Sequence, residues 1–96
     1  MLNFEWDDNK NLSNFQKHGI WFEEAALIFQ GPTLSRIDDR RDYGEVRTRT
    51  IGKIARQIAV TVLHTDRAGK IRIISARLSS RMERKQYDDH DSQIIE

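Results

Sequence analysis

The segment QIAVTVLHTDRAGKIRIISAR, residues 57–77, decides the expected fold class. Two runs within it, residues 57–65 and 70–77, are rich in Ile, Val and Thr, a composition that favours β-strands. The residues DRAG, 66–69, separate the two runs and place their glycine at the end, as hairpin turns of four residues do. The segment therefore predicts an antiparallel β-hairpin.

Side-chain alternation along the hairpin assigns residues to two faces of the expected sheet, because neighbouring side chains of a strand point in opposite directions. In the first run, Val60, Val62 and His64 share one face. In the second run, Ile73 and Arg77 share one face. The pattern predicts one mainly apolar face, which needs a covering layer, and a second face with more polar groups.

Shorter β-rich runs precede this hairpin. Residues 46–54 form one such run, separated from the hairpin by a brief Ala-Arg turn, and residues 33–37 and 3–6 are candidates for short strands. Because consecutive strands joined by short turns pair with opposite directions, the pattern predicts an antiparallel meander.

Three helices are expected from their end signals. Asp7 is suited to be the N-cap of the first helix and Gly19 its C′ residue, and the Gly-Pro pair at 31–32 ends the second. A capping box, SRME at residues 80–83, begins the third helix, which is expected to run to about Tyr87.

The first two helices carry apolar positions that require a flat partner, among them Leu12 and Phe15 at i, i+3 spacing. Trp6 and Trp21 flank the first helix and are expected in the core rather than stacked on bases. The expected fold is α+β: an antiparallel β-sheet meander with two N-terminal helices and one C-terminal helix. The helices should pack mainly on one sheet face and leave the other partly open, with several arginines and His64 near the open face.

Length and composition favour one domain, residues 1–96, with an acidic tail at 88–96. The chain is 38% hydrophobic and 32% charged and contains no cysteine, so disulfides and thiolate chemistry are excluded. The absence of an apolar run near 18 residues and of an export signal indicates a soluble, cytoplasmic protein. The three histidines form no metal-ligand motif, and we expect no metal site and no cofactor.

The net charge of +1 conceals a strong segregation along the chain. Residues 1–32 carry −3, residues 33–65 carry +3, residues 66–87 carry +5, and residues 88–96 carry four acids without a base. This asymmetry indicates a face that binds a polyanion. The alternative is ordinary solvated charge on a small protein.

The densest basic set follows the hairpin into the third helix. Arg67 lies in the turn, Arg77 at a strand end, and Arg81, Arg84 and Lys85 share helix-face spacings. Arginine forks match phosphate geometry, and several at one sheet end would stabilise charge on a phosphorus centre.

Cleavage of RNA also needs proton transfer, for which His64, Glu83 and Tyr87 are the nearby titratable groups. Three structural interpretations remain open beside it. Arg81, Glu83 and Arg84 then form a surface network, His64 is a structural residue, and Tyr87 caps the core. Glu83 is either the capping residue of the third helix or a base, and the capping-box spacing favours the cap.

Several motifs together resemble the BrnT family of bacterial toxins. FEWD at residues 4–7, KHG at 17–19 and FEEA at 22–25 resemble the start of such proteins. RIISAR at 72–77, with ER at 83–84 and Tyr87 after it, resembles their later part. The resemblance spans roughly residues 4–87.

The resemblance implies a type II toxin with a fold similar to RelE-type ribonucleases, which cleaves RNA without a metal and arrests growth. It also implies a partner, a ribbon-helix-helix antitoxin of the BrnA type, with which the toxin represses its own operon; operator DNA is bound only through that complex. Matched positions suggest Arg67, Arg77, Arg84 and Tyr87 as catalytic residues, and chemistry adds His64. The expected RNA-binding residues are Arg72, Arg81, Lys85 and Lys53.

A second hypothesis belongs to another class of protein. A non-catalytic module would use the same basic face to hold an acidic protein or nucleic acid. Incubation with RNA and a chelator distinguishes the two, because only the enzyme cleaves.

Overall fold

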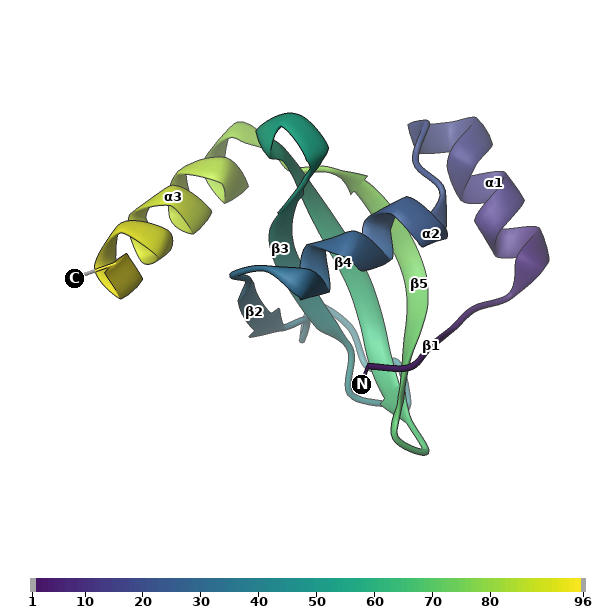
Figure 1. The fold of residues 1–96 in the computed structure, drawn as a ribbon. Helices are drawn as coiled ribbons and strands as arrows, with labels where there is room; N and C mark the ends of the chain where they lie inside the picture. Colours follow the sequence, from purple (N-terminus) through teal and green to yellow (C-terminus); the bar gives the residue numbers. More distant parts are fainter. Residues whose placement is uncertain (1, 96) are drawn as a thin grey trace.

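The computed structural model describes residues 2–95, with side-chain surroundings for all of these except residues 56 and 92–95. One sheet of five strands, in the order β1-β5-β4-β3-β2, organises the chain (Figure 1). The elements are β1 (Phe4–Glu5), α1 (Asp8–His18), α2 (Phe22–Ala25), the 3₁₀ helix η1 (Ala26–Gln30), β2 (Leu34–Ile37), β3 (Thr48–Ile54), the 3₁₀ helix η2 (Ala55–Gln57), β4 (Ile58–Arg67), β5 (Lys70–Leu78) and α3 (Arg81–Ile95).

The sheet is mixed, which corrects the expectation of a purely antiparallel meander. Strands β2 to β5 pair antiparallel as predicted, but β1 pairs parallel with β5, joining Phe4 to Ile71. The α+β class is confirmed. A parallel pair needs a long connection between its strands. Here the chain between β1 and β5 contains β2, β3 and β4 as well as the first two helices.

Two irregularities modify the predicted hairpin. Ala68 and Gly69 alone form its turn, and both have positive φ, which suits the two-residue turns whose twist matches that of the strands. A register shift between Leu63 and His64 places Ile73 opposite His64 and Ala76 opposite Val62. Strict alternation therefore fails in β5, and Ile73 and Ala76 lie on the same face.

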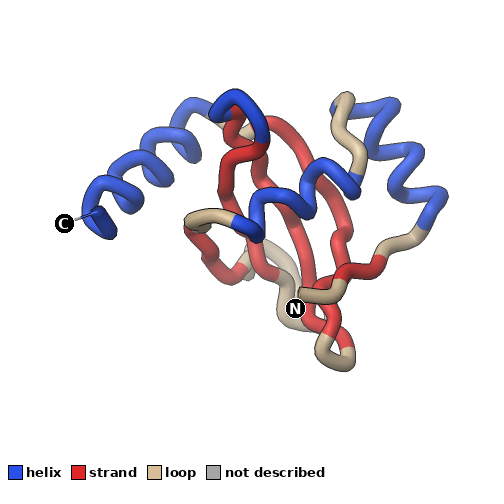
Figure 2. The backbone as a smooth tube through the Cα atoms, in the orientation of Figure 1, coloured by secondary structure: helices blue, strands red, loops and turns tan. Residues whose placement is uncertain are grey.

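The two faces of the sheet have different covers. Helices α1 and α2 and η1 lie across one face, whereas α3 lies beside β3, at the edge away from α1 (Figures 1 and 2). We call the sheet face under α1, α2 and η1 the covered face, and the opposite face of the sheet the open face. The largest side chains of the main core are fully buried between α2, η1 and the covered face: Phe22, Ile28, Val60, Val62 and Ile73.

Two local features explain how the helices pack on this face: the hydrogen bonds of Asn14 and the missing side chain of Gly52. Asn14 is buried and donates from Nδ2 to the carbonyls of Ile20 and Ala76, while its Oδ1 accepts from the Ala76 N–H at 3.1 Å. It thus joins α1 to β5. Gly52 lets η1 approach β3, because a Cβ there would lie 2.7 Å from the Ile28 Cβ.

The apolar stripe expected on the first helix is wrong in its orientation. Asn11 and Asn14 are the buried residues of α1, whereas Leu12 and Phe15 are exposed. Phe15 stacks instead on Trp21, with ring centroids 4.1 Å apart. Here the hydrogen bonds that the Asn11 and Asn14 amides make to backbone groups outweigh the burial of two apolar side chains.

The C-terminal helix is longer than predicted. It continues from Arg81 to Ile95 rather than ending near Tyr87, so the expected tail is helical through its described part. Tyr87 is buried against Leu34 and Ile51, which fixes α3 over the β2–β3 end of the open face.

Candidate functional site

Arginines from three strands gather on the open face. Arg36 of β2 is directly opposite Arg49 of β3, and one row further Arg77 of β5 is opposite Thr61 of β4. Ile51 is opposite Thr61, and since residues 49 and 51 of one strand point to the same side, all three guanidinium groups belong to this face. The pattern of β3 thus aligns basic groups across the sheet.

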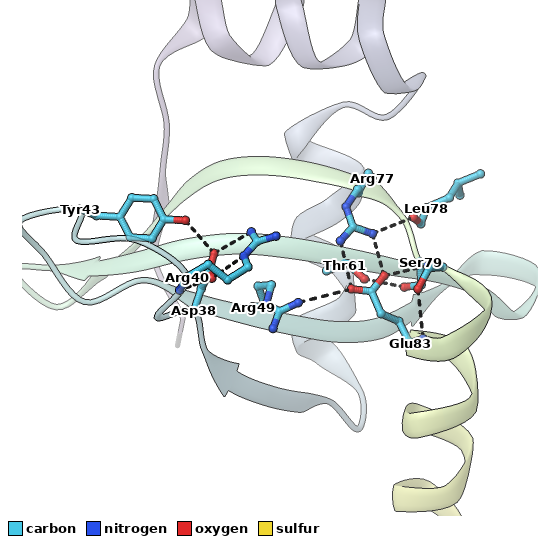
Figure 3. A network of polar contacts seen from close by, with 10 residues as sticks. Asp38, Arg40, Tyr43, Arg49, Thr61, Arg77, Leu78, Ser79 and Glu83 are labelled. Carbon is cyan, nitrogen blue, oxygen red and sulfur yellow. Dashed lines mark hydrogen bonds and ion pairs between the residues drawn. The ribbon is translucent and has the colours of Figure 1, made fainter.

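Glu83 of α3 reaches two of these arginines, Arg49 and Arg77, from the helix (Figure 3). Arg77 donates to its two carboxylate oxygens from Nη1 and Nη2, at 2.7 and 3.0 Å. Arg49 Nη1 lies 4.0 Å from the same carboxylate, an ion pair without a hydrogen bond. We call Arg49, Arg77 and Glu83 the open-face cluster.

Glu83 is also the capping residue that its spacing predicted. The Ser80 N–H donates to Glu83 Oε1 at 2.8 Å, and the Glu83 N–H donates to Ser80 Oγ at 3.2 Å. The cap fixes the start of α3, and the bidentate pair with Arg77 fixes that helix start to the end of β5. One carboxylate therefore sets the helix terminus and the arginine fork together.

The electrostatics of the cluster keep Glu83 ionised. Burial raises the pKa of its carboxyl, but hydrogen bonds from Arg77 and the Ser80 N–H, with the charge of Arg77, outweigh burial and lower the pKa to about 2. Such a carboxylate is a weak proton acceptor at neutral pH. Arg36, Arg49 and Arg77 against one carboxylate leave a net charge of +2 on this part of the face.

His64 lies on the covered face, away from the cluster. It is 8% exposed, its ring meets Phe29 edge-on with centroids 5.2 Å apart, and Nε2 is 2.7 Å from Thr50 Oγ1. Burial lowers the pKa of His64, and the nearby Asp66 charge opposes this only in part. The structure does not bring His64 together with the arginines, and among the described residues its Nδ1 is buried without a hydrogen-bond partner.

Tyr87 is held by packing and by a hydrogen bond of its hydroxyl group. Its hydroxyl donates to the Pro32 carbonyl at 2.9 Å, and Lys53 Nζ lies 5.5 Å from its ring centroid. Burial, together with the charges of Asp91 and Asp88, raises the pKa of Tyr87. Its proton is therefore held more firmly than in a free tyrosine.

The remaining predicted basic residues are spread around the molecule. Arg67 is near the hairpin turn and pairs with Glu45 at 3.7 Å, and Arg72 pairs with Glu5 of β1 at 3.1 Å. Arg67 follows Thr61 by six positions along β4, which places the two residues roughly 20 Å apart. The hairpin end and the open-face cluster are therefore separate places.

The basic residues of α3 are exposed. Arg81 and Arg84 lie on its solvent side, and Lys85 pairs with Asp89 at 3.1 Å. Lys53 pairs with Asp88 at 3.4 Å. Of the predicted site residues, only Arg77 is part of the open-face cluster.

Sequence reasoning missed Arg36 and Arg49. Alternation in residues 46–54 does carry the signal for Arg49, because it places that residue on the same face as Ile51 and Lys53. The signal for Arg36 is weaker, since a four-residue edge strand has little pattern of its own.

A second polar network orders the loop between β2 and β3. Asp38 is buried, accepts from Arg40 Nε and Nη2 at 2.8 and 2.9 Å, and accepts from the Tyr43 hydroxyl at 3.0 Å (Figure 3). The hydrogen bond from Arg40 is the main reason why the pKa of Asp38 lies well below its usual range. This network accounts for several charges of the loop without any ligand.

Among the described residues, no group of three or more His, Asp or Glu side chains is placed to hold a metal ion. Within the same part of the chain, no helix has the length and apolar character needed to span a membrane.

The fold and the open-face cluster define an α+β protein with an arginine-lined surface suited to anions. The sequence model of the family described as "Ribonuclease toxin, BrnT, of type II toxin-antitoxin system" matches residues 6–83. The chain therefore belongs to the BrnT family of ribonuclease toxins.

A solved structure supports the fold. The crystal structure of the Brucella abortus ribonuclease toxin BrnT superposes with a TM-score of 0.63, covering 84% of this chain and 100% of that one, at 22% sequence identity. A search of curated proteins by sequence finds no match. At 22% identity, the structural likeness shows the fold alone.

Proposed function

We propose that this chain is a metal-independent endoribonuclease that arrests growth by cleaving RNA on its open sheet face. One observation carries the proposal: a chain of a ribonuclease toxin family presents arginines from separate strands around a single ionised carboxylate. Guanidinium groups supply the positive charge that a phosphate needs, and their forked donors match its oxygens. Kinship with RelE-type ribonucleases is part of the same proposal.

The proposed reaction is an internal transfer at phosphorus. The RNA 2′-oxygen gives its proton to water and bonds to the adjacent phosphorus, while the bond to the 5′-oxygen breaks and that oxygen takes up a proton from water. Negative charge grows on the non-bridging oxygens during this step. Arg49 and Arg77 would stabilise it, since donors placed in advance contribute most where charge develops.

Glu83 orients the guanidinium group of Arg77. Its two oxygens engage Nη1 and Nη2 of Arg77, so they limit the rotation of that guanidinium. Arg49 keeps donors that Glu83 does not use, because the pair at 4.0 Å is too long for a hydrogen bond. Arg49 therefore has donors left for a phosphate, and Arg77 is the more rigidly held of the two.

The family implies an antitoxin partner. We propose that this partner is a ribbon-helix-helix protein of the BrnA type that covers the open face in the cytoplasm. The complex would repress its own operon, with DNA contacted by the antitoxin. A net charge of +2 around the cluster favours an acidic segment of the antitoxin in the place of RNA.

Cleavage of RNA by the purified chain in the presence of a chelator tests the enzyme proposal. We expect cleavage by the wild type and a loss of about 100-fold in Arg77→Lys, which keeps a charge for Glu83 but loses the fork. Lys17→Met, an exposed change on α1, is the control. Intact RNA with retained, salt-sensitive binding would instead support a non-catalytic module.

A further inference from the structure

A groove between β2 and α3 continues from the open-face cluster and adds a further basic residue, Arg36, to it. One part of the groove is lined by Arg36 and Arg49 from the sheet and by Glu83 and Gln86 from α3. The next part shares Arg36 and Gln86 and ends at His90. Because the two parts have these residues in common, they form one continuous groove along the helix.

Arg36 and Arg49 face each other as a like-charged cross-strand pair. Like charges directly opposite on antiparallel strands destabilise the pair. Among the residues whose side chains the structure describes, Arg36 forms no ion pair, and Arg49 has only the 4.0 Å contact with a carboxylate that Arg77 already engages. Arg49 Nε is also buried without a hydrogen-bond partner in the described structure. The two guanidinium groups therefore bring donors that make few contacts within the described structure to one place, an arrangement suited to a phosphate.

The far end of the groove carries an imidazole. His90 follows Glu83 by seven residues, two turns of α3, which places it about 10 Å further along the helix. The charged groups that line the pocket with it are Arg36 from β2 and Asp89 from its own helix, and Asp89 pairs with Lys85. His90 lies outside residues 6–83, the part that the family matches.

We propose that this groove binds the RNA strand next to the cleavage site, with a phosphate between Arg36 and Arg49 and the following nucleotide against His90. The inference rests on the proposed function, because it names where the substrate of that site continues. An RNA strand fits better than an acidic side chain, since the groove offers donors over about two helical turns, and a strand presents a phosphate at every nucleotide.

His90 would supply an aromatic ring at the end of this groove, and RNA-binding proteins commonly hold an unstacked base against such a ring. The two arginines would then bind the phosphate, and His90 would contact the nucleotide that follows it.

Binding of a 2′-O-methyl RNA oligonucleotide, measured by fluorescence anisotropy, tests the groove without cleavage, because this RNA has no 2′-hydroxyl to react. Arg36→Met should weaken binding about tenfold and lower the salt dependence by about one phosphate contact. His90→Gln should weaken binding about fivefold, because the nucleotide loses the ring that it packs against. His18→Gln, an exposed histidine on α1, is the matched control and should behave as the wild type.

Two results would overturn the inference: unchanged affinity and salt dependence in Arg36→Met, or unchanged affinity in His90→Gln. Loss of antitoxin binding with unchanged RNA binding would also overturn it and assign the groove to the protein partner. These failures are distinct from failure of the proposed function, which depends on cleavage of ordinary RNA and on Arg77. Thermal melts of all variants check that each one is folded.

Discussion

Replacing Glu83 by glutamine tests how the open-face cluster is held together. Glutamine keeps the shape of the side chain and one carbonyl acceptor, but it removes the charge that Arg77 and Arg49 share. Because the Glu83 side chain is only 11% exposed, water does little to screen this loss. We therefore expect a large decrease in the free energy of unfolding.

The magnitude follows from the pKa of Glu83, which is lowered from 4.5 to about 2 in the folded chain. At about 1.36 kcal/mol for each pKa unit, the ionised carboxylate stabilises the fold by about 3 kcal/mol at neutral pH. Since the folded pKa lies below the unfolded one, this stabilisation is complete above about pH 4.5. It is lost as the pH falls toward 2.

Urea denaturation of the wild type and of Glu83→Gln, from pH 7 to the lowest pH at which both fold, measures this difference. We expect a gap of about 3 kcal/mol at pH 7 that narrows steadily below pH 4.5. Asp39→Asn, a change of an exposed acid, is the control and should show no such gap. A gap below about 1 kcal/mol at pH 7, or one independent of pH, would refute the assigned role of Glu83.

Two further substitutions test the packing around the site. Gly52→Ala should destabilise the chain by about 1–3 kcal/mol in urea denaturation, because the new Cβ would lie 2.7 Å from the Ile28 Cβ; unchanged stability would contradict that close approach. Tyr87→Phe should lose about 1 kcal/mol through the hydrogen bond to the Pro32 carbonyl, while cleavage of RNA stays within about threefold of the wild type. A loss of cleavage at unchanged stability would support the prediction that Tyr87 is a catalytic residue.

The alternation of apolar and polar residues along the chain predicts much of the sheet. Alternation identifies β3, β4 and β5 and places Val60 and Val62 in the core, because local side-chain order determines which face is apolar. The capping box predicts the start of α3 for an equally local reason. Local signals therefore describe the elements well.

Long-range contacts account for what the sequence does not reveal. The parallel pairing of Phe4 with Ile71 joins residues far apart in the chain, and no local pattern specifies it. Asn14 is buried because it binds the backbone of Ala76 on a distant strand, which reverses the expected orientation of α1. Only the observed packing of α3 shows that its capping residue, Glu83, also pairs with Arg77.

The composition of the site depends on the same packing. The sequence groups Arg77 and Arg84 because they follow each other along the chain, but α3 turns Arg84 toward solvent. Arg49 joins Arg77 although it lies two strands away, because Glu83 reaches both. Proximity in sequence was therefore a poor guide to proximity at the open face.

The rate of RNA cleavage by Arg49→Met, compared with Arg84→Met, tests the central claim most directly. Each change removes one guanidinium, from the open face in the first case and from the exposed side of α3 in the second. Since Arg49 forms only a long ion pair, its loss should leave the fold intact. The open-face cluster predicts a decrease of about 100-fold for Arg49→Met and less than about threefold for Arg84→Met. Equal effects, or the reverse order, would contradict cleavage at the open face.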